Sequence, residues 1–594
     1  MLATGAADSL EVSVPTGGRD VLTVGPLAGS KPMLPKEAGV ATAERVQEAG
    51  AAWPEYWRIH VLNQPERTWS VQLTAPVTTP IAKGDKCLLL FYGRSLADKA
   101  VGSASVEVKS PPLYPKLAQT NFRLGTQWQP VVLAFTAPED GPAGKCGVSI
   151  HLGAQMQKVD ITGLRLINYG PDFPEDKLPR PVLTYEGREA DAPWRKEAFA
   201  RIEKHRKGDF TLQVVDAKGT PVPNARVQAT LRRHEFGFGS AVNAKWLNDA
   251  SADGERYRAI VDECFSRVVF ENDMKPFAWK EANAPGASGT YRRQWLEQSL
   301  TWLAERRFTV RGHYLCWGPF EEWSEALKSN PEAIREKVLA YIGEILPAMG
   351  DRVAEWDALN HPVGWEKGMC IDTVLGFDFY VEVFKEARKL TKLPLWINED
   401  QVFREGRQQE EYFDVIQKLL KAGVRPDGIG NQAHFDSSYL PSPEEMLANS
   451  DRFARLVPAL ELTEFDVQTN GDEQLAADFT RDILITTFSH PAYTGMVLWG
   501  FWEGAHWKPE TALWRKDWSE KPAVSAWKAL VCDQWRTKVA LTTDDQGKAA
   551  LRGFFGSYDL TVEWDGASQT CPVLLGRGQQ GKVKLVVRQK QEAE

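Results

Sequence analysis

The 594-residue chain has no apolar run of about 18 residues, the length at which a segment becomes a candidate for crossing a membrane. A membrane-spanning helix is therefore not expected. An excess of positive charge is also lacking: the formal net charge is −8, which argues against a nucleic-acid partner. Residues 1–10 have no basic segment before an apolar one, as an intact signal peptide would. Their small Ala and Gly residues fit the remnant of a cleavage region, so we predict a secreted or periplasmic protein.

Cysteine is scarce, and the spacings between its seven residues fit no metal site. We predict that most are buried thiols, with Cys87 and Cys146 the one pair within a single domain that is worth testing as a disulfide. Neither a metal nor an organic cofactor is predicted. Tryptophan, in contrast, is plentiful at 22 residues. Flat indole faces stack on sugar rings, although packing in the core and at interfaces accounts for most of them.

The amino-terminal third is predicted to be rich in β-strands. Residues 46–185 contain short apolar or alternating segments separated by Gly, Pro and Asp turns, a pattern typical of a jelly-roll β-sandwich. Residues 1–45 are predicted to be an irregular leader. A connecting helix is predicted within residues 186–208, from Asp191 as its N-cap to Gly208 at its end.

Two distant segments, residues 209–234 and 538–594, have the pattern of two halves of one small immunoglobulin-like β-domain. The first contains GTPVPNARV between two predicted strands, and the second contains DQGK followed by GSYDLTV. Residues 235–537 lie between these halves, which normally adjoin. Because domain insertion is tolerated where host and guest have neighbouring termini, we predict that the split β-domain hosts the intervening region.

The intervening residues 235–537 repeat a strand followed by an amphipathic helix, as in TVRGHYLCW before EALKSNPEAIREKVLAYIGEIL. Such units over about 250 to 300 residues predict a (β/α)8 barrel. The predicted fold class is therefore α/β: a (β/α)8 TIM barrel with two accessory all-β domains. In such a barrel, every strand brings its carboxyl end to one shared mouth, where catalytic residues lie.

Six motifs in order make the barrel resemble glycoside hydrolase family 10, the xylanase family. In this chain they read ENDMK, RGHYLCW, WDALNH, GNQAH, LTEFD and WGFWEGAHW, between residues 271 and 507. The spacing agrees independently, because the 103 residues from His361 to Glu464 equal three βα units of about 34 residues each. His361 and Glu464 are therefore predicted to belong to barrel strands four and seven.

The resemblance implies retaining hydrolysis of β-glycosidic bonds in xylan or a xylan-like β-glycan. Glu464 matches the nucleophile, whose carboxylate forms a covalent glycosyl-enzyme. His434 and Asp357 match residues that hydrogen-bond in sequence to this nucleophile, with a core His–Asp pair as the alternative. Asn360 matches the contact to the sugar 2-hydroxyl. Further matches to sugar-binding positions are Glu271, Asn272, Lys275, His313, Trp317, Gln432, Trp499 and Trp507; for the tryptophans, core packing is the alternative.

The acid/base position departs from the family. A retaining enzyme needs a second group that protonates the leaving oxygen and later deprotonates water; it is a glutamate in the family and His361 here. An imidazole can do both, since its unperturbed pKa lies near 6.5. The first alternative is a proton from another carboxylate, and the second is a barrel that only binds glycans, like a lectin. The candidate carboxylates are Glu366, Glu399, Asp400 and Glu503.

A second departure concerns specificity. After Trp317 the family has H-S-Q, whereas this chain has Gly318, Pro319 and Phe320. The glycone side of the cleft is therefore expected to differ, and a differently substituted or linked β-glycan is the alternative to xylan. The sandwich before the barrel resembles carbohydrate-binding modules in its strand pattern and position, with a purely structural role as its alternative. The predicted partner is thus a polysaccharide or oligosaccharide.

Overall fold

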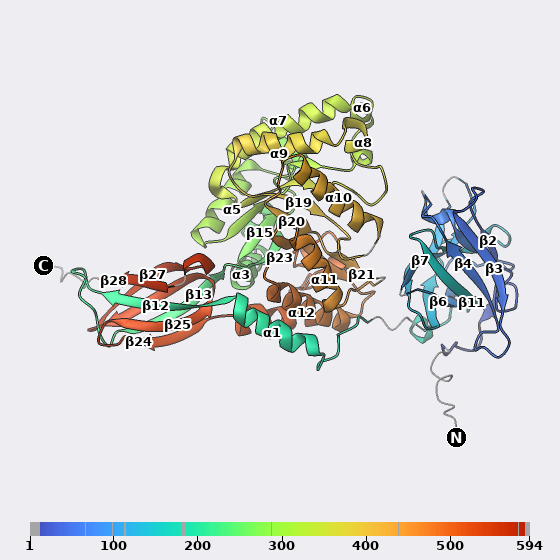
Figure 1. Cartoon of the computed structure of the whole chain (residues 1–594), viewed down its shortest axis with the longest axis horizontal. Helices are drawn as coiled ribbons and strands as arrows, with labels where there is room; N and C mark the ends of the chain where they lie inside the picture. The colour runs from blue at the N-terminus through green and yellow to red at the C-terminus, as the bar shows by residue number, and fades with distance from the viewer. Residues whose placement is uncertain are drawn as a thin grey trace, which may run out of the picture. The chain divides into compact units, whose positions relative to one another are not determined.

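A computed structural model of the chain contains two compact units, residues 1–183 and 184–594 (Figure 1). It describes residues 12–587 except positions 66, 98, 112, 113, 180–183, 287, 405, 438 and 580. The first 11 residues of the predicted leader lie outside this range. Among the described residues, every helix is too short or too polar to span a bilayer.

The first unit is a sandwich of two antiparallel sheets. One sheet has the order β3-β4-β11-β6-β9 with β1 beside β11, and the other has the order β2-β5-β10-β7-β8. The strands are β1 Arg19–Asp20, β2 Lys31–Met33, β3 Ala41–Gln47, β4 Glu55–Val61, β5 Gln72–Pro76, β6 Lys86–Ser95, β7 Ala100–Val108, β8 Lys116–Leu124, β9 Gln129–Thr136, β10 Cys146–His151 and β11 Gln157–Asn168. Two 3₁₀ turns, η1 Thr68–Ser70 and η2 Glu175–Lys177, complete it.

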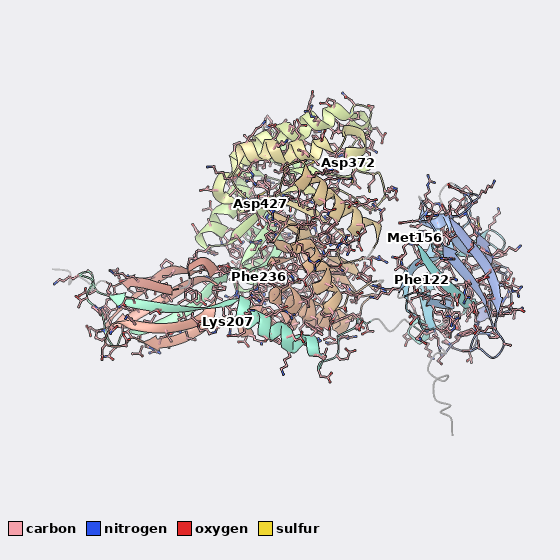
Figure 2. All side chains as sticks on the ribbon, viewed as in Figure 1. Phe122, Met156, Lys207, Phe236, Asp372 and Asp427 are labelled. Carbon is pink, nitrogen blue, oxygen red and sulfur yellow. The ribbon has the colours of Figure 1, made fainter. Side chains whose placement is uncertain are left out.

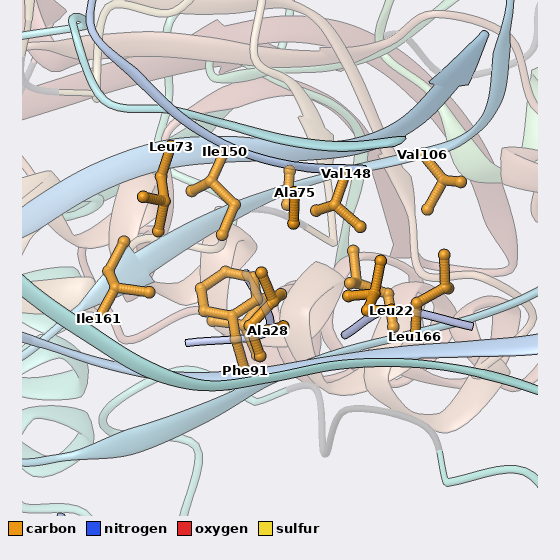
Figure 3. Packing of buried hydrophobic residues seen from close by; sticks show 14 of the residues in the cluster. Leu22, Ala28, Leu73, Ala75, Phe91, Val106, Val148, Ile150, Ile161 and Leu166 are labelled. Atoms are coloured by element: carbon orange, nitrogen blue, oxygen red, sulfur yellow. The ribbon is translucent and has the colours of Figure 1, made fainter. Parts of the chain in front are cut away.

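Alternate residues of the facing strands fill the sandwich core, because successive side chains of a strand point to opposite faces. Figure 3 shows Phe91 of β6 opposite the strands that carry Leu73 and Ile150. Leu22 and Ala28 are buried in the same core, and β1 and β2 also fall within residues 1–45. The prediction that this whole segment is irregular is therefore wrong.

Cys87 and Cys146 both lie in this core as free thiols, so the disulfide considered for them is not formed. Five of the seven cysteines are buried, as predicted; Cys532 and Cys571 are partly exposed. The ligand of the sandwich stays a prediction.

The second unit begins with a helix that is shorter than predicted. α1 spans Pro193–His205, with Ala192 in place of Asp191 as N-cap, and Gly208 already belongs to strand β12. Proline suits the first helical position, where an N–H would have no partner within the helix. Arg206, just after the helix, donates hydrogen bonds to carbonyls of the barrel, those of Phe488, His490 and Tyr493. Figure 2 shows Lys207 and Phe236 at this junction.

The two predicted halves of the β-domain contribute strands to the same two sheets. β12 (Lys207–Val215) lies between β25 and β28, and β13 (Arg226–His234) lies between β24 and β26. β12 and β13 thus belong to different sheets, although the predicted turn joins them directly in sequence. The carboxyl-terminal strands are β24 Lys538–Thr542, β25 Lys548–Phe554, β26 Gly556–Trp564, β27 Ala567–Leu575 and β28 Gly581–Val586, with η8 at Arg577–Gln579.

Deleting residues 538–594 is expected to expose residues 207–234 to proteases, because both β12 and β13 lose the strands on either side of them. Limited proteolysis followed by mass spectrometry of the fragments measures this, with a truncation after residue 587 as the control. If residues 207–234 keep their protection after the deletion, the two segments do not depend on each other for folding.

Eight parallel strand positions close the barrel between the two halves of the β-domain. The strand order is β16-β15-β14-β23-β22-β20-β19-β18-β17, and pairing of β16 with β18 closes the ring. β18 is the fourth position and β22 the seventh, as the spacing predicts. The strands are β14 Gly237–Val242, β15 Arg267–Phe270, β16 Thr309–Gly312, β17 Cys316–Trp317, β18 Glu355–Asn360, β19 Leu395–Glu399, β20 Gly428–Asn431, β21 His434–Asp436, β22 Leu460–Gln468 and β23 Tyr493–Leu498.

Helices surround the parallel strands (Figure 1). They are α2 Ala244–Leu247, α3 Ala252–Cys264, α4 Pro276–Ala282, α5 Arg293–Glu305, α6 Glu325–Lys328, α7 Pro331–Met349, α8 Asp372–Leu375, α9 Asp378–Leu390, α10 Arg407–Lys421, α11 Pro443–Ala454, α12 Glu473–Ser489 and α13 Pro522–Trp527. Short turns are η3 Phe320–Glu322, η4 Gly350–Arg352, η5 Glu503–Ala505 and η6 Pro509–Thr511, and η7 Lys528–Gln534 is a π-helix.

Candidate active site

The predicted site residues lie at the carboxyl ends of the barrel strands. Because all strands of the ring are parallel, these ends face one mouth. Glu464 lies within β22, Asn360 ends β18 and Glu399 ends β19. The remaining predicted residues on or just after strands are Glu271, His313, Trp317, Asp357, His361, Gln432, His434 and Trp499.

Glu464 is a buried carboxylate held at both oxygens. Only 4% of the residue is exposed. The side-chain amide of Asn398 donates to Oε1 at 2.8 Å, and Nε2 of His434 lies 3.4 Å from Oε2. Burial alone would raise the pKa of the Glu464 carboxyl, but the contact with His434 and the positive charge of the surrounding histidines hold it below its usual value. The group is therefore an oriented anion, as a nucleophile must be.

His434 is fixed between two carboxylates. Its Nδ1 lies 3.0 Å from Oδ2 of Asp466, on the side opposite Glu464. Burial would lower the pKa of His434, but Asp466 and Glu464 outweigh it and raise the pKa to about 10. The indole N–H of Trp507 donates to the same oxygen of Asp466 at 2.8 Å. His434 is therefore a cation at neutral pH that orients the Glu464 carboxylate.

Asp357 does not take part in this contact, and its predicted role as the partner of His434 is wrong. Oδ2 of Asp357 lies 2.8 Å from Nδ1 of His313 and accepts from Nε of Arg311 at 3.2 Å. Asp466, which replaces it, stands two residues after Glu464, and residues i and i+2 of a strand share a face. That spacing is the sequence signal that could have identified Asp466.

His361, the predicted acid/base, lies immediately after β18. Its backbone has a φ of 53°, in the left-handed region that non-glycine residues rarely adopt. Nδ1 lies 2.9 Å from Oε1 of Glu399, and Nε2 lies 2.9 Å from the amide nitrogen of Gln432. Burial would lower the pKa of His361, but the charges of Glu399 and Glu464 raise it above its ordinary value.

Gly318 explains part of the altered segment after Trp317. A Cβ at position 318 would lie 1.8 Å from the backbone oxygen of His361, so only glycine fits. The Gly318 N–H also donates to the carbonyl of Asn360 at 2.8 Å. The two departures from the family pattern, at His361 and at Gly318, are therefore in direct contact.

Three amide side chains connect Glu464 to His361. Oδ1 of Asn360 accepts from Asn398 and from Gln432, both at 3.0 Å. Asn398 reaches Glu464 and Gln432 reaches His361. From the sequence alone Asn398 is a polar residue near a strand end without an assigned role, and the contact with Glu464 gives it one.

The other candidate carboxylates differ in their surroundings. Glu399 is completely buried, and burial would raise its pKa, but His361 and backbone N–H groups hold it below its usual value. Glu503 forms an ion pair with Lys521 at 2.7 Å. Burial raises the pKa of Asp400, whose Oδ1 has no hydrogen-bond partner among the described residues. Glu366 is exposed. Asp400 therefore combines burial, a raised pKa and an oxygen without a hydrogen-bond partner among the described residues.

Polar residues predicted to bind sugar lie on the β15 side. Oε2 of Glu271 accepts from the Asn243 amide at 3.2 Å, and Lys275 donates to the side-chain oxygen of Asn272 at 3.0 Å. The Lys275 amine is also 5.8 Å from the ring centroid of Trp499. These groups form a charged and aromatic wall.

Indole rings flank two histidines of the site, His361 and His434. Trp317 lies 4.9 Å and Trp365 lies 5.6 Å from the His361 ring, and the Trp507 ring lies 4.8 Å from that of His434. Trp365 and Trp507 are each 48% exposed, so their faces are available for stacking on a ligand. Trp365 was not predicted. In the part of the chain that the structure describes, no group of three His, Cys, Asp or Glu residues is arranged to hold a metal ion.

The family model for glycosyl hydrolase family 10 matches residues 227–530. The chain is 28% identical over 372 residues to anti-sigma-I factor RsgI6 of Acetivibrio thermocellus, which covers 62% of this chain and 46% of that protein. It is 24% identical over 443 residues to endo-1,4-beta-xylanase 1 of Arabidopsis thaliana, with 70% and 45% covered. The chain thus spans less than half the length of these relatives. The structure of native xylanase 10B from Thermotoga maritima is similar with a TM-score of 0.44 and 21% identity, covering 50% of this chain and 95% of that one.

Proposed function

Because the chain belongs to glycosyl hydrolase family 10, we propose that its barrel hydrolyses β-glycosidic bonds with retention, in xylan or a xylan-like β-glycan. The observation that carries this proposal is the Glu464 carboxylate, buried, ionised and held at both oxygens by Asn398 and His434. The endo-1,4-beta-xylanases among the relatives support the substrate class.

In the first half of the reaction, a Glu464 oxygen attacks the anomeric carbon, and the bond to the leaving oxygen breaks. We assign the proton that the leaving oxygen takes up to Nε2 of His361. In the second half, a water oxygen attacks the same carbon, its proton goes to Nε2, and Glu464 departs as a carboxylate. Asn360, which contacts both Asn398 and Gln432, suits a hydrogen bond to the sugar 2-hydroxyl.

There are two alternatives to this proposal, one for the acid and one for the function, and different experiments test them. Asp400 is the alternative acid, because burial raises its pKa and one of its oxygens is unpartnered among the described residues. Non-hydrolytic glycan binding is the alternative function. Glycan binding alone does not require an aligned, ionised Glu464. The presence of such a carboxylate therefore favours a hydrolase.

The decisive experiment is pre-steady-state kinetics with an excess of 2,4-dinitrophenyl β-xylobioside, whose leaving group needs almost no protonation. A burst of dinitrophenolate stoichiometric with enzyme, absent from Glu464→Ala, is the expected result. It tests the nucleophile without involving the acid. Absence of a burst, together with calorimetric binding of xylo-oligosaccharides, would instead identify a glycan-binding protein.

A further inference from the structure

The two nitrogens of the His361 ring have different neighbours, a carboxylate at Nδ1 and an amide side chain at Nε2. An ionised carboxylate only accepts hydrogen bonds, so Nδ1, 2.9 Å from Glu399, must be its donor. Nε2 lies 2.9 Å from the side-chain nitrogen of Gln432, which also donates to Oδ1 of Asn360. Because Nδ1 stays the donor to Glu399, Nε2 is the ring nitrogen that can gain or lose a proton.

Glu399 is built to stay ionised. It has no exposed surface, and its two oxygens accept hydrogen bonds from several donors besides His361. These donors are the backbone N–H groups of Val363 at 2.9 Å, Gly364 at 3.1 Å and Asp400 at 2.9 Å, and the Gln408 amide at 3.0 Å. A carboxylate with that many donors keeps its negative charge even when the neighbouring imidazole is neutral.

The constant negative charge of Glu399 offsets the extra positive charge that a histidine brings to the acid/base position. A glutamic acid there is neutral before it donates its proton and carries −1 afterwards. A lone histidine would carry +1 and then 0. The charge beside buried Glu464 would therefore be one unit more positive than with a glutamic acid, both before and after proton transfer. The His361–Glu399 pair carries 0 and then −1, the same two charges as a single carboxylic acid.

We propose that Glu399 is a positioning residue that lets the His361–Glu399 pair act as the electrostatic equivalent of one carboxylic acid. This rests on the proposed function. During glycosylation, Glu464 changes from −1 to a neutral ester while the pair changes from 0 to −1, so the total charge of the site stays constant. During hydrolysis of the ester, both changes reverse. Without Glu399 the total would also stay constant, but at 0 instead of −1, and Glu464 would face a cationic imidazole before glycosylation instead of a neutral pair.

The first test is Glu399→Gln in the full chain. It removes the charge but keeps an oxygen that can accept from Nδ1. The alkaline limb of kcat/KM should move to lower pH by about 1 to 2 units, because the imidazolium loses its counter-charge. Turnover of xylo-oligosaccharides at neutral pH should fall about 10²-fold, while the dinitrophenyl burst rate changes little. Glu399→Asp keeps the charge, so its alkaline limb should lie between those of the other two proteins.

The matched control is Glu411→Gln. Glu411 lies on α10 near Gln408 and pairs with Arg407 at 2.5 Å, without contact to His361. Its alkaline limb should stay where it is in the unaltered protein. Thermal melting of each variant separates a charge effect from unfolding.

A second test does not depend on how well Glu399→Gln folds. In His361→Glu, two carboxylates share one site and repel each other, so the new acid is poor. Adding Glu399→Gln should relieve this, and the double variant should exceed the His361→Glu single variant at least about tenfold in kcat/KM. Charge equivalence predicts this recovery, whereas a purely structural role for Glu399 predicts a further loss.

These experiments distinguish failure of the proposed function from failure of the role proposed for Glu399. If the unaltered protein gives no dinitrophenyl burst, the proposed function is wrong. If it gives a burst but the alkaline limb stays in place in Glu399→Gln and the double variant shows no recovery, the function stands and the role of Glu399 is wrong.

Discussion

Replacement of Glu464 by alanine is expected to lower kcat/KM by about 10⁵- to 10⁶-fold, the scale of losing a catalytic nucleophile. In the proposed mechanism this carboxylate bonds to the anomeric carbon, and the neighbouring His434 and Asn398 cannot replace it. The dinitrophenyl burst should vanish completely. Stopped-flow release of dinitrophenolate and steady-state hydrolysis of xylo-oligosaccharides measure the two effects.

Azide gives this variant a sharper readout. Removing the side chain opens space on the face of the sugar that Glu464 occupied, and a small anion there can attack the anomeric carbon. The expected product is an α-glycosyl azide, identified by its anomeric coupling in NMR. Glu411→Gln is the control and should turn over normally. Retention of turnover by Glu464→Ala without azide would contradict the assignment.

Replacement of His361 by alanine is expected to have an effect that depends on the leaving group. With xylo-oligosaccharides, kcat/KM should fall about 10³- to 10⁴-fold, the range for loss of a general acid. With the dinitrophenyl glycoside, the burst should remain, but the following steady state should slow because no base activates water. Glycosyl-enzyme should therefore accumulate, and intact-protein mass spectrometry would detect it at Glu464.

The role of His361 also predicts in which direction activity changes with pH. Since Glu399 and Glu464 raise the pKa of His361, its imidazolium survives above the ordinary value of 6.5. Activity on poor leaving groups should be present below the raised pKa and be lost as the pH increases through it. His361→Ala should lack this limb. If its oligosaccharide turnover is unchanged and Asp400→Asn instead removes the limb, Asp400 is the acid.

The order of the strands and helices along the chain could be predicted from the sequence, because the patterns that indicate them are local. The strand-then-helix periodicity predicted the barrel, and the 103-residue spacing placed His361 and Glu464 at strand positions four and seven. Parallel strands bring their carboxyl ends to one mouth whatever the details of packing, so the motif residues could be assigned to one site. The division of the small β-domain into two distant segments could also be predicted, because each segment has its own local strand pattern.

Partners across the barrel were decided only by the tertiary structure. Which strand-end side chain meets which depends on register, backbone bulges and side-chain direction in strands far apart in sequence. His434 therefore meets Asp466 instead of Asp357, and His361 meets Glu399. Likewise β12 and β13 adjoin in sequence but join different sheets, because each pairs with strands more than 300 residues away. The sequence determined the fold and its list of reactive groups; long-range packing determined how those groups are paired, and hence which charges they carry.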